Sequence, residues 1–157
     1  AARRAHLPLG LLYPSLYEDT PSCRSPELRY LLPRGMRQFY TQSYLGEDER
    51  ARAALLQDWR VAPLRSPALG RVPAASVVTC GHDPLEDEGH MLVRALEAAG
   101  ESAVQHTHMP TMVHGFLTLP AFATDRQHCT LALDRLQSAV EASVAEYFNR
   151  GSSPVDA

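Results

Sequence analysis

The feature that most constrains the fold is an apolar, β-branched run over Ala74–Cys80, which stops at a glycine just before a helix start signal. A continuous apolar run of this length predicts a strand buried on both faces of a parallel sheet. Asp83 and Pro84 then predict the start of a helix, with the aspartate as N-cap and the proline at the first helical position. We therefore expect the strand–turn–helix unit from which α/β folds are built.

A second strand should follow this helix. Apolar residues recur at helical spacing over Pro84–Ala99, and Gly100 supplies a left-handed stop. The sequence then alternates over Ser102–Met109, which predicts a strand with His106 and His108 on the same face. Strands that alternate with helices in this way are typical of a parallel sheet.

The residues before this unit predict a strand and a helical insertion. Leu7–Tyr13 is apolar and short enough for a buried strand. Residues 15–60 then carry apolar residues at helical spacing over Arg34–Leu45 and Glu47–Trp59, which predicts two amphipathic helices. An insertion of this length between strands is typical of a lid or another functional segment.

The chain should close with a long helix over Thr124–Phe148, opened by a capping box of Thr124 and Gln127. The buried row of this helix is predicted to be Ala132, Leu136, Val140, Val144 and Phe148. Residues 150–157 are expected to form a flexible tail. Together the elements predict one α/β domain over residues 1–157, with a mostly parallel sheet flanked by helices.

Composition excludes several classes of function. A hydrophobic fraction of 45% supports a substantial core, and the formal net charge of -3 favours neither nucleic acid nor an anionic membrane as a partner. All 15 basic residues are arginine, so the chain offers no lysine for Schiff-base or P-loop chemistry. We expect no cofactor.

The cysteines, the absence of a long apolar run and the N-terminal residues bear on the cellular location of the protein. Cys23, Cys80 and Cys129 are too few and too scattered for a disulfide framework, and Cys80 is expected to be a small buried hydrophobic residue. No apolar run approaches the roughly 20 residues of a membrane span. A cytoplasmic location is therefore expected. The sequence begins without an initiator methionine or a signal-peptide core, and we interpret it as part of a longer protein.

Two titratable residues follow consecutive predicted strands. Asp83 comes soon after the 74–80 strand, and His114 lies in a loop after the next one, beside Gly115. The carboxyl ends of parallel strands meet at one edge of a sheet, where an acid and a base can come together for nucleophilic catalysis. Asp83 has an equally good structural role as a helix cap, and one carboxylate can serve both purposes.

A metal site is an alternative use of the other histidines. His106 and His108 share one strand face, and Cys80 and His82 share another, so these four side chains could form a tetrahedral zinc site. No compact ligand motif is present, and we assign no metal ligands. The acidic run at residues 86–88 suits a helix N-terminus and needs no further function.

A nucleophile is missing from the candidate residues. No serine has glycine at both second-neighbour positions, which is the spacing of the nucleophile elbow, and no His-Gly-Gly sequence occurs. In α/β-hydrolases the nucleophile precedes the acid and the histidine in the chain. We therefore expect the nucleophile upstream of Ala1.

Three segments, residues 81–89, 96–100 and 112–116, carry a resemblance to a known family. They read Gly-His-Asp-Pro-Leu-Glu-Asp-Glu-Gly, Leu-Glu-Ala-Ala-Gly and Met-Val-His-Gly-Phe, and they resemble the hormone-sensitive-lipase-like esterases of the α/β-hydrolase superfamily. The resemblance implies the C-terminal part of an α/β-hydrolase fold, with Asp83 as the triad acid and His114 as the triad base.

The chain departs from that family in two places. Thr111 stands where the family usually has glycine, and the His-Gly-Gly and Gly-Asp-Ser-Ala-Gly motifs are missing. The resemblance implies that the intact protein is a serine carboxylesterase acting on a small-molecule ester, that the upstream half of the same domain is its partner, and that a homo-oligomer can form. The chain alone should then be inactive. A non-catalytic hydrolase-like domain that binds a partner stays open as an alternative, as does a peptidase.

Overall fold

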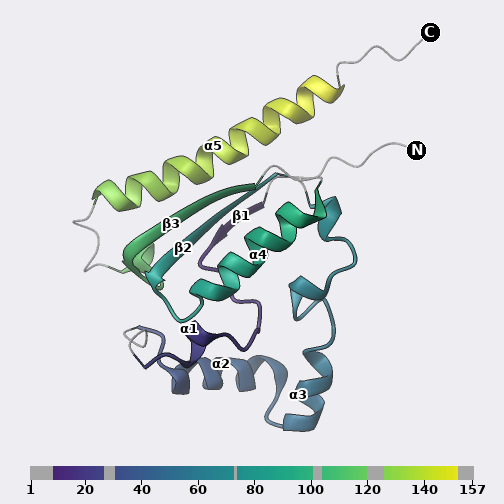
Figure 1. Cartoon of the computed structure of the whole chain (residues 1–157), viewed down its shortest axis with the longest axis vertical. Coiled ribbons are helices and arrows are strands. Elements are labelled where there is room, and N and C mark those ends of the chain that lie inside the picture. The colour runs from purple at the N-terminus through teal and green to yellow at the C-terminus, as the bar shows by residue number, and fades with distance from the viewer. Residues whose placement is uncertain (1–8, 27–30, 73, 101–103, 120–125, 152–157) are drawn as a thin grey trace.

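The computed structural model describes residues 9–26, 31–72, 74–100, 104–119 and 126–151. Its sheet contains three parallel strands in the order β1 (Leu9–Leu12), β2 (Ala75–His82) and β3 (Val104–Val113). The helices α4 (Glu86–Ala99) and α5 (Arg126–Gly151) lie on opposite faces of this sheet (Figure 1). The predicted α/β architecture, a parallel sheet flanked by helices, is confirmed.

The central strand β2 divides the core into two halves. Ala75 and Val77 pack toward α4, whereas Val78 and Cys80 pack toward α5, and each of these four side chains is at most 1% exposed. Burial of a valine-sized side chain stabilises the fold by roughly 1.5–3 kcal/mol, so β2 contributes to the stability of both layers. The prediction that Cys80 is a small buried hydrophobic residue is confirmed.

The insertion after β1 contains three helices within the described residues: α1 (Pro21–Arg24), α2 (Arg34–Leu45) and α3 (Glu49–Leu55). The predicted bounds of α2 are confirmed, and the helix stops at Gly46, whose φ of 90° few other residues adopt. The prediction for α3 was too long, because the helix ends at Leu55 and Trp59 lies in the turns beyond it. Short 3₁₀ turns, η1 (Pro63–Arg65) and η2 (Leu69–Arg71), then lead to β2.

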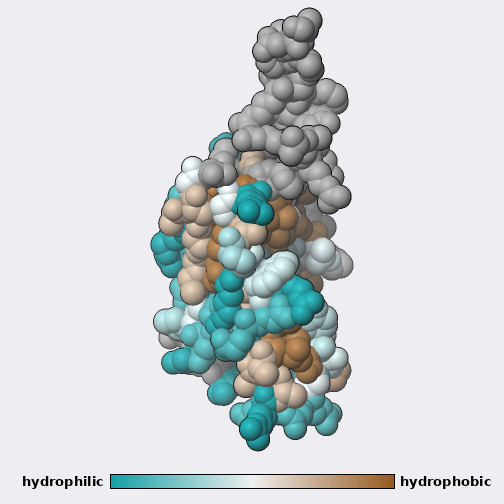
Figure 2. Space-filling view, turned by 90° about the vertical axis from the view of Figure 1, so that its right-hand side faces the viewer, coloured by the Kyte–Doolittle hydropathy of each residue, from teal (hydrophilic) through white to brown (hydrophobic). Residues whose placement is uncertain are grey.

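The apolar residues of α2 lie on the surface, although their spacing predicts a buried face. Met36, Phe39, Tyr40 and Tyr44 are 42–68% exposed, and Leu45 is the buried residue of the helix. Figure 2 shows one side of the molecule, on which apolar residues lie at the surface among polar ones. Helical spacing identifies an apolar face, but it does not say which part of a protein covers that face.

The strand β3 is longer than predicted, because it continues through a bulge beyond Met109. Cys80 pairs with Met109 and His82 pairs with Val113, so two residues of β2 span the same length as four residues of β3. A bulge takes up the extra residues and bends the strand that carries it. Pro110 lies in this bulge, where a residue without an N–H group is tolerated.

Gly81 is the residue of β2 that faces the bulge. A Cβ atom placed at Gly81 would lie 2.9 Å from the Cα and carbonyl carbon of Pro110 and closer still to its carbonyl oxygen. Backbone atoms cannot move aside as the end of a side chain can, so this position requires glycine. The contact helps to set the register of β3 against β2, and therefore the position of His114 after the strand.

The helix α4 begins later than predicted. Its first residue is Glu86 rather than Pro84, and the residues before it form a turn in which Asp83 Oδ1 accepts a 2.8 Å hydrogen bond from the Leu85 N–H group. Asp83 is therefore the cap of this turn and not the N-cap of the helix. The predicted left-handed stop at Gly100, with φ 80°, is confirmed.

The helix α5 extends to Gly151, two residues into the segment predicted as a tail. In its predicted buried row, Ala132 is fully buried and Leu136 is partly buried, but Val140 is 43% exposed. Thr124 of the predicted capping box and residues 152–157 lie outside the described residues, and the burial of Val144 and Phe148 is likewise not described. None of the helices in the described ranges has the length and apolar character needed to cross a membrane.

The contact between Gly81 and Pro110 predicts the effect of a single added methyl group. We expect Gly81→Ala to lower the free energy of unfolding by about 1–3 kcal/mol, because the bulge must shift to admit the Cβ atom. Gly35→Ala is the matched control: nothing lies within 4 Å of a Cβ atom at Gly35, in the first turn of α2. Chemical denaturation measures both changes, and equal stability of the two variants would contradict the role of the bulge.

Candidate active site

Asp83 and His114 form a hydrogen-bonded pair at the carboxyl edge of the sheet. Asp83 follows β2 and His114 follows β3, and the bulge in β3 brings the two turns together. His114 Nδ1 lies 2.9 Å from Asp83 Oδ2. The Asp83 side chain is 1% exposed and the His114 side chain is 25% exposed. The buried acid is thus shielded from water, while the imidazole remains accessible.

Both partners are held by their own turns. Asp83 uses its second oxygen, Oδ1, to accept the Leu85 N–H group, so both carboxylate oxygens are engaged. After His114, Gly115 adopts φ 73° and the chain enters the 3₁₀ turn η3 (Phe116–Thr118). Phe116 is 1% exposed and packs in the core on the α5 side. The loop is therefore anchored by a buried aromatic side chain.

Tyr13 lies beside the pair, although the sequence pattern around it predicts only a strand. Its ring meets the His114 ring edge-on, with centroids 4.9 Å apart, and contacts Phe116 at 6.2 Å. Tyr13 has a φ of 38°, an uncommon conformation for a non-glycine residue that is frequent at functional sites. Its position directly after β1, at the same sheet edge as the pair, is the signal that could have identified it.

The geometry determines which proton transfers the pair can perform. When His114 donates its Nδ1–H group to Asp83, the lone pair of the neutral ring lies on Nε2, which can accept a proton from a nucleophile. A buried carboxylate at this distance also stabilises the imidazolium that forms. Cys80 is the cysteine nearest to Asp83 in the sequence, but it is not a suitable nucleophile. Burial and the nearby Asp83 carboxylate raise the pKa of its thiol to about 12.

The alternative zinc site of Cys80, His82, His106 and His108 is not assembled. Cys80 packs in the core that faces α5. His106 and His108 instead hydrogen-bond to Thr79, whose side chain lies on the other face of β2. Alternate residues of a strand point to opposite faces, so Cys80 cannot join the two histidines.

The acidic run at the start of α4 anchors the insertion. Glu88 is fully buried, and its carboxylate accepts the backbone N–H groups of Leu16 and, at 3.5 Å, Glu18. Asp87 Oδ2 accepts the Ser22 N–H group at 2.8 Å. Burial raises the pKa of Glu88, and the N–H groups and a nearby arginine oppose that rise. The run thus has a structural role beyond its favourable place at a helix N-terminus.

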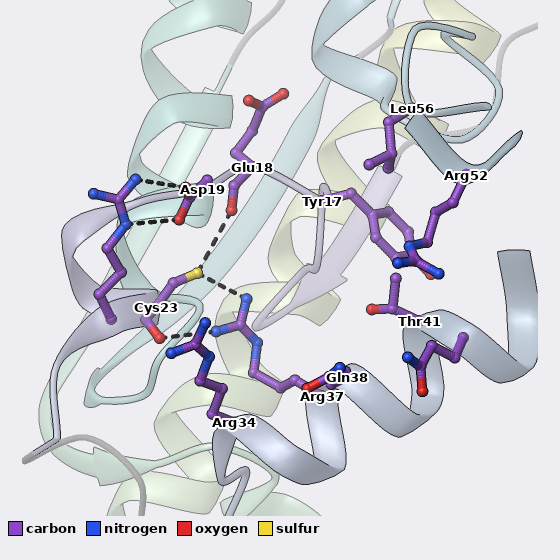
Figure 3. Close-up of a pocket in the computed structure, with 12 residues that line it drawn as sticks. Tyr17, Glu18, Asp19, Cys23, Arg34, Arg37, Gln38, Thr41, Arg52 and Leu56 are labelled. Atoms are coloured by element: carbon purple, nitrogen blue, oxygen red, sulfur yellow. Dashed lines mark hydrogen bonds and ion pairs between the residues drawn. The ribbon is translucent and has the colours of Figure 1, made fainter. Parts of the chain in front are cut away.

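A cavity of about 530 Å³ lies within the insertion, between α1, α2, α3 and the segment before α1 (Figure 3). Arg37 crosses it and donates hydrogen bonds to Cys23 O at 3.1 Å and Cys23 Sγ at 2.7 Å. The lining is rich in arginine, with Arg24, Arg34, Arg37 and Arg52. Neither Asp83 nor His114 contributes to it, so this cavity is separate from the candidate active site.

Sequence comparison places the chain among known hydrolases. A family described as having the alpha/beta hydrolase fold matches residues 3–118. The carboxylic ester hydrolase LipN of Mycobacterium tuberculosis is 37% identical over 89 residues, and the carboxylesterase NlhH of the same species is 41% identical over 71 residues. These matches cover 57% and 43% of this chain, respectively, and 22% of each relative.

Solved structures agree with the sequence matches. EstE1, a thermostable carboxylesterase cloned from a metagenomic library, superposes with a TM-score of 0.67 at 29% identity, covering 85% of this chain and 45% of that chain. A thermostable esterase from Pseudomonas putida gives a TM-score of 0.66 at 27% identity, covering 87% and 41%.

The chain thus matches less than half the length of these relatives and solved structures. The family match over residues 3–118 includes the three strands, the turns that follow them and the helices between β1 and β2. Together the comparisons show that the chain belongs to the hormone-sensitive-lipase-like family of the α/β-hydrolase fold.

Proposed function

We propose that this chain supplies the acid and the base of a serine carboxylesterase whose nucleophile and oxyanion hole lie in a segment upstream of Ala1. The observation that carries the proposal is the 2.9 Å hydrogen bond between Asp83 and His114, with the acid buried and the base accessible. The carboxylesterase names of the relatives support the same class of reaction.

In the proposed reaction, His114 moves protons and Asp83 does not. As the upstream serine attacks the ester carbonyl, His114 Nε2 accepts the hydroxyl proton and then delivers it to the departing alcohol. Water hydrolyses the acyl-enzyme by the same route, with His114 again as base and then as acid. Asp83 stays ionised, holds the imidazole in the Nδ1–H tautomer and stabilises the imidazolium.

Two neighbouring contacts support these roles. The Leu85 N–H group donates to Asp83 Oδ1, so turning the carboxylate away from His114 would break this hydrogen bond. Tyr13 packs against the imidazole, with ring centroids 4.9 Å apart, and restricts its rotation. Preorganisation of this kind lowers the cost of reaching the reactive geometry. The reaction needs no cofactor.

The proposal predicts how activity depends on the upstream segment. The 157-residue chain alone should not hydrolyse a short-chain aryl ester, whereas the same chain joined to its upstream coding segment should. His114→Ala in the joined protein should lower kcat by about 10⁴–10⁶-fold, as loss of a triad base does. His128→Ala, on α5, is the control and should change kcat less than twofold.

Two results would contradict the proposal. Hydrolysis by the chain alone, abolished by substitution of one of its own serines, would place the nucleophile within this sequence. Absence of hydrolysis in a folded joined protein, over a panel of esters, would favour the non-catalytic alternative, and cleavage of peptide substrates would favour a peptidase.

A second prediction separates the two roles of Asp83. Asp83→Asn should retain the fold, because the amide oxygen can still accept the Leu85 N–H group. It should lower kcat of the joined protein by about 10⁴-fold, because the amide favours the wrong imidazole tautomer. Asp87→Asn makes the same chemical change on a carboxylate that bonds Ser22, and its kcat should be almost unchanged. Full activity of Asp83→Asn would leave Asp83 with a structural role only.

A further inference from the structure

Three histidines form a cluster between α4 and β3. His90 lies on α4, and His106 and His108 lie on the face of β3 that points toward this helix. The His90 ring is 4.9 Å from the His106 ring and 5.3 Å from the His108 ring, measured between centroids. One nitrogen from each of the three rings lies within 4.8 Å of the other two.

Thr79 orients two of the rings from the adjacent strand. Its hydroxyl oxygen lies 2.9 Å from His106 Nε2 and 2.9 Å from His108 Nδ1. A hydroxyl that accepts the Nδ1–H group of His108 leaves the lone pair of that ring on Nε2. Metal-binding histidines are commonly held in this way, with the second ring nitrogen bonded to a neighbouring polar group.

Glu86 adds a carboxylate to the same place. Its Oε1 atom lies 3.8 Å from His90 Nε2 and 3.7 Å from His108 Nε2. Two imidazole nitrogens thus face one carboxylate oxygen from the helix and from the strand. The Glu86 side chain is 25% exposed, and those of His90 and His108 are 31% and 34% exposed, so an ion can reach the cluster from solvent.

We propose that His90, His106 and His108 bind a divalent transition-metal ion, zinc by preference, with Glu86 or water as the fourth ligand. Zinc binds imidazole nitrogen and carboxylate oxygen with tetrahedral geometry, which requires ligand atoms about 3.3 Å apart. The histidine nitrogens are already within 4.8 Å of one another, so small rotations of the partly exposed rings complete the site. The inference does not depend on the proposed ester hydrolysis, since neither Asp83 nor His114 is a ligand.

The bound ion would act as a structural link. It would join α4, which begins soon after Asp83, to β3, which ends just before His114. Binding to the folded state alone stabilises a protein in proportion to the logarithm of the free metal concentration. The site would therefore stabilise the scaffold that holds the Asp83–His114 pair, without taking part in proton transfer.

Metal titration of the purified 157-residue chain, first freed of metal with a chelator, tests the proposal. Calorimetry should show one Zn²⁺ per chain, and Co²⁺ should give the intense visible absorption of a tetrahedral complex. The melting temperature should rise with added Zn²⁺. In NMR spectra of the unaltered chain, Co²⁺ should shift the ring signals of His90, His106 and His108, which tests the ligand set without a substitution.

Variants identify the ligands independently. His90→Ala should lose one-to-one binding, and Thr79→Val, which keeps the shape of the side chain but removes the hydroxyl, should weaken binding about 10–100-fold. His82→Ala is the matched control and should bind as the unaltered chain does. No saturable binding, binding unchanged in His90→Ala, or Co²⁺-shifted signals from other histidines would each overturn the proposal.

Discussion

The close backbone contact between Gly81 and Pro110 determines where the candidate site forms. Without a side chain at Gly81, the bulge in β3 can press against β2, and two residues of β2 span four of β3. Val113 therefore pairs with His82, and the next residue, His114, lies beside Asp83. A regular pairing beyond Met109 would leave the histidine two positions further along the strand direction. The hydrogen bond of the pair thus depends on a packing contact that involves neither of its partners.

Much of this arrangement could be predicted from the sequence, because its signals are local. The buried run of β2, the periodicity of α4 and the stop at Gly100 each lie within one element, and parallel topology then brings Asp83 and His114 to one edge of the sheet. The bulge could not be predicted, since it depends on the register between two strands. Sequence alternation ends at Met109, and nothing local shows that pairing resumes at Val113.

The features that sequence reasoning missed all depend on how separate elements pack. Glu88 belongs to an acidic run for which a helix N-terminus was explanation enough, but the path of the insertion buries it, and its carboxylate accepts the Leu16 N–H group. The zinc alternative grouped His106 and His108 with Cys80 and His82 of β2. The packing of α4 against β3, which brings His90 beside the two histidines, cannot be predicted from the local sequence. The same limit applies to α2, since its spacing predicts an amphipathic helix but does not show that its apolar residues lie exposed.

The central claim is that Asp83 holds His114 as the Nδ1–H tautomer, and nitrogen-detected NMR of the histidine rings tests it most directly. We expect a proton on His114 Nδ1 whose signal is shifted far downfield by the hydrogen bond to the buried carboxylate, and we expect that downfield signal to be lost in Asp83→Asn. A His114 ring that carries its proton on Nε2, or that exchanges freely between tautomers in the unaltered chain, would contradict the account.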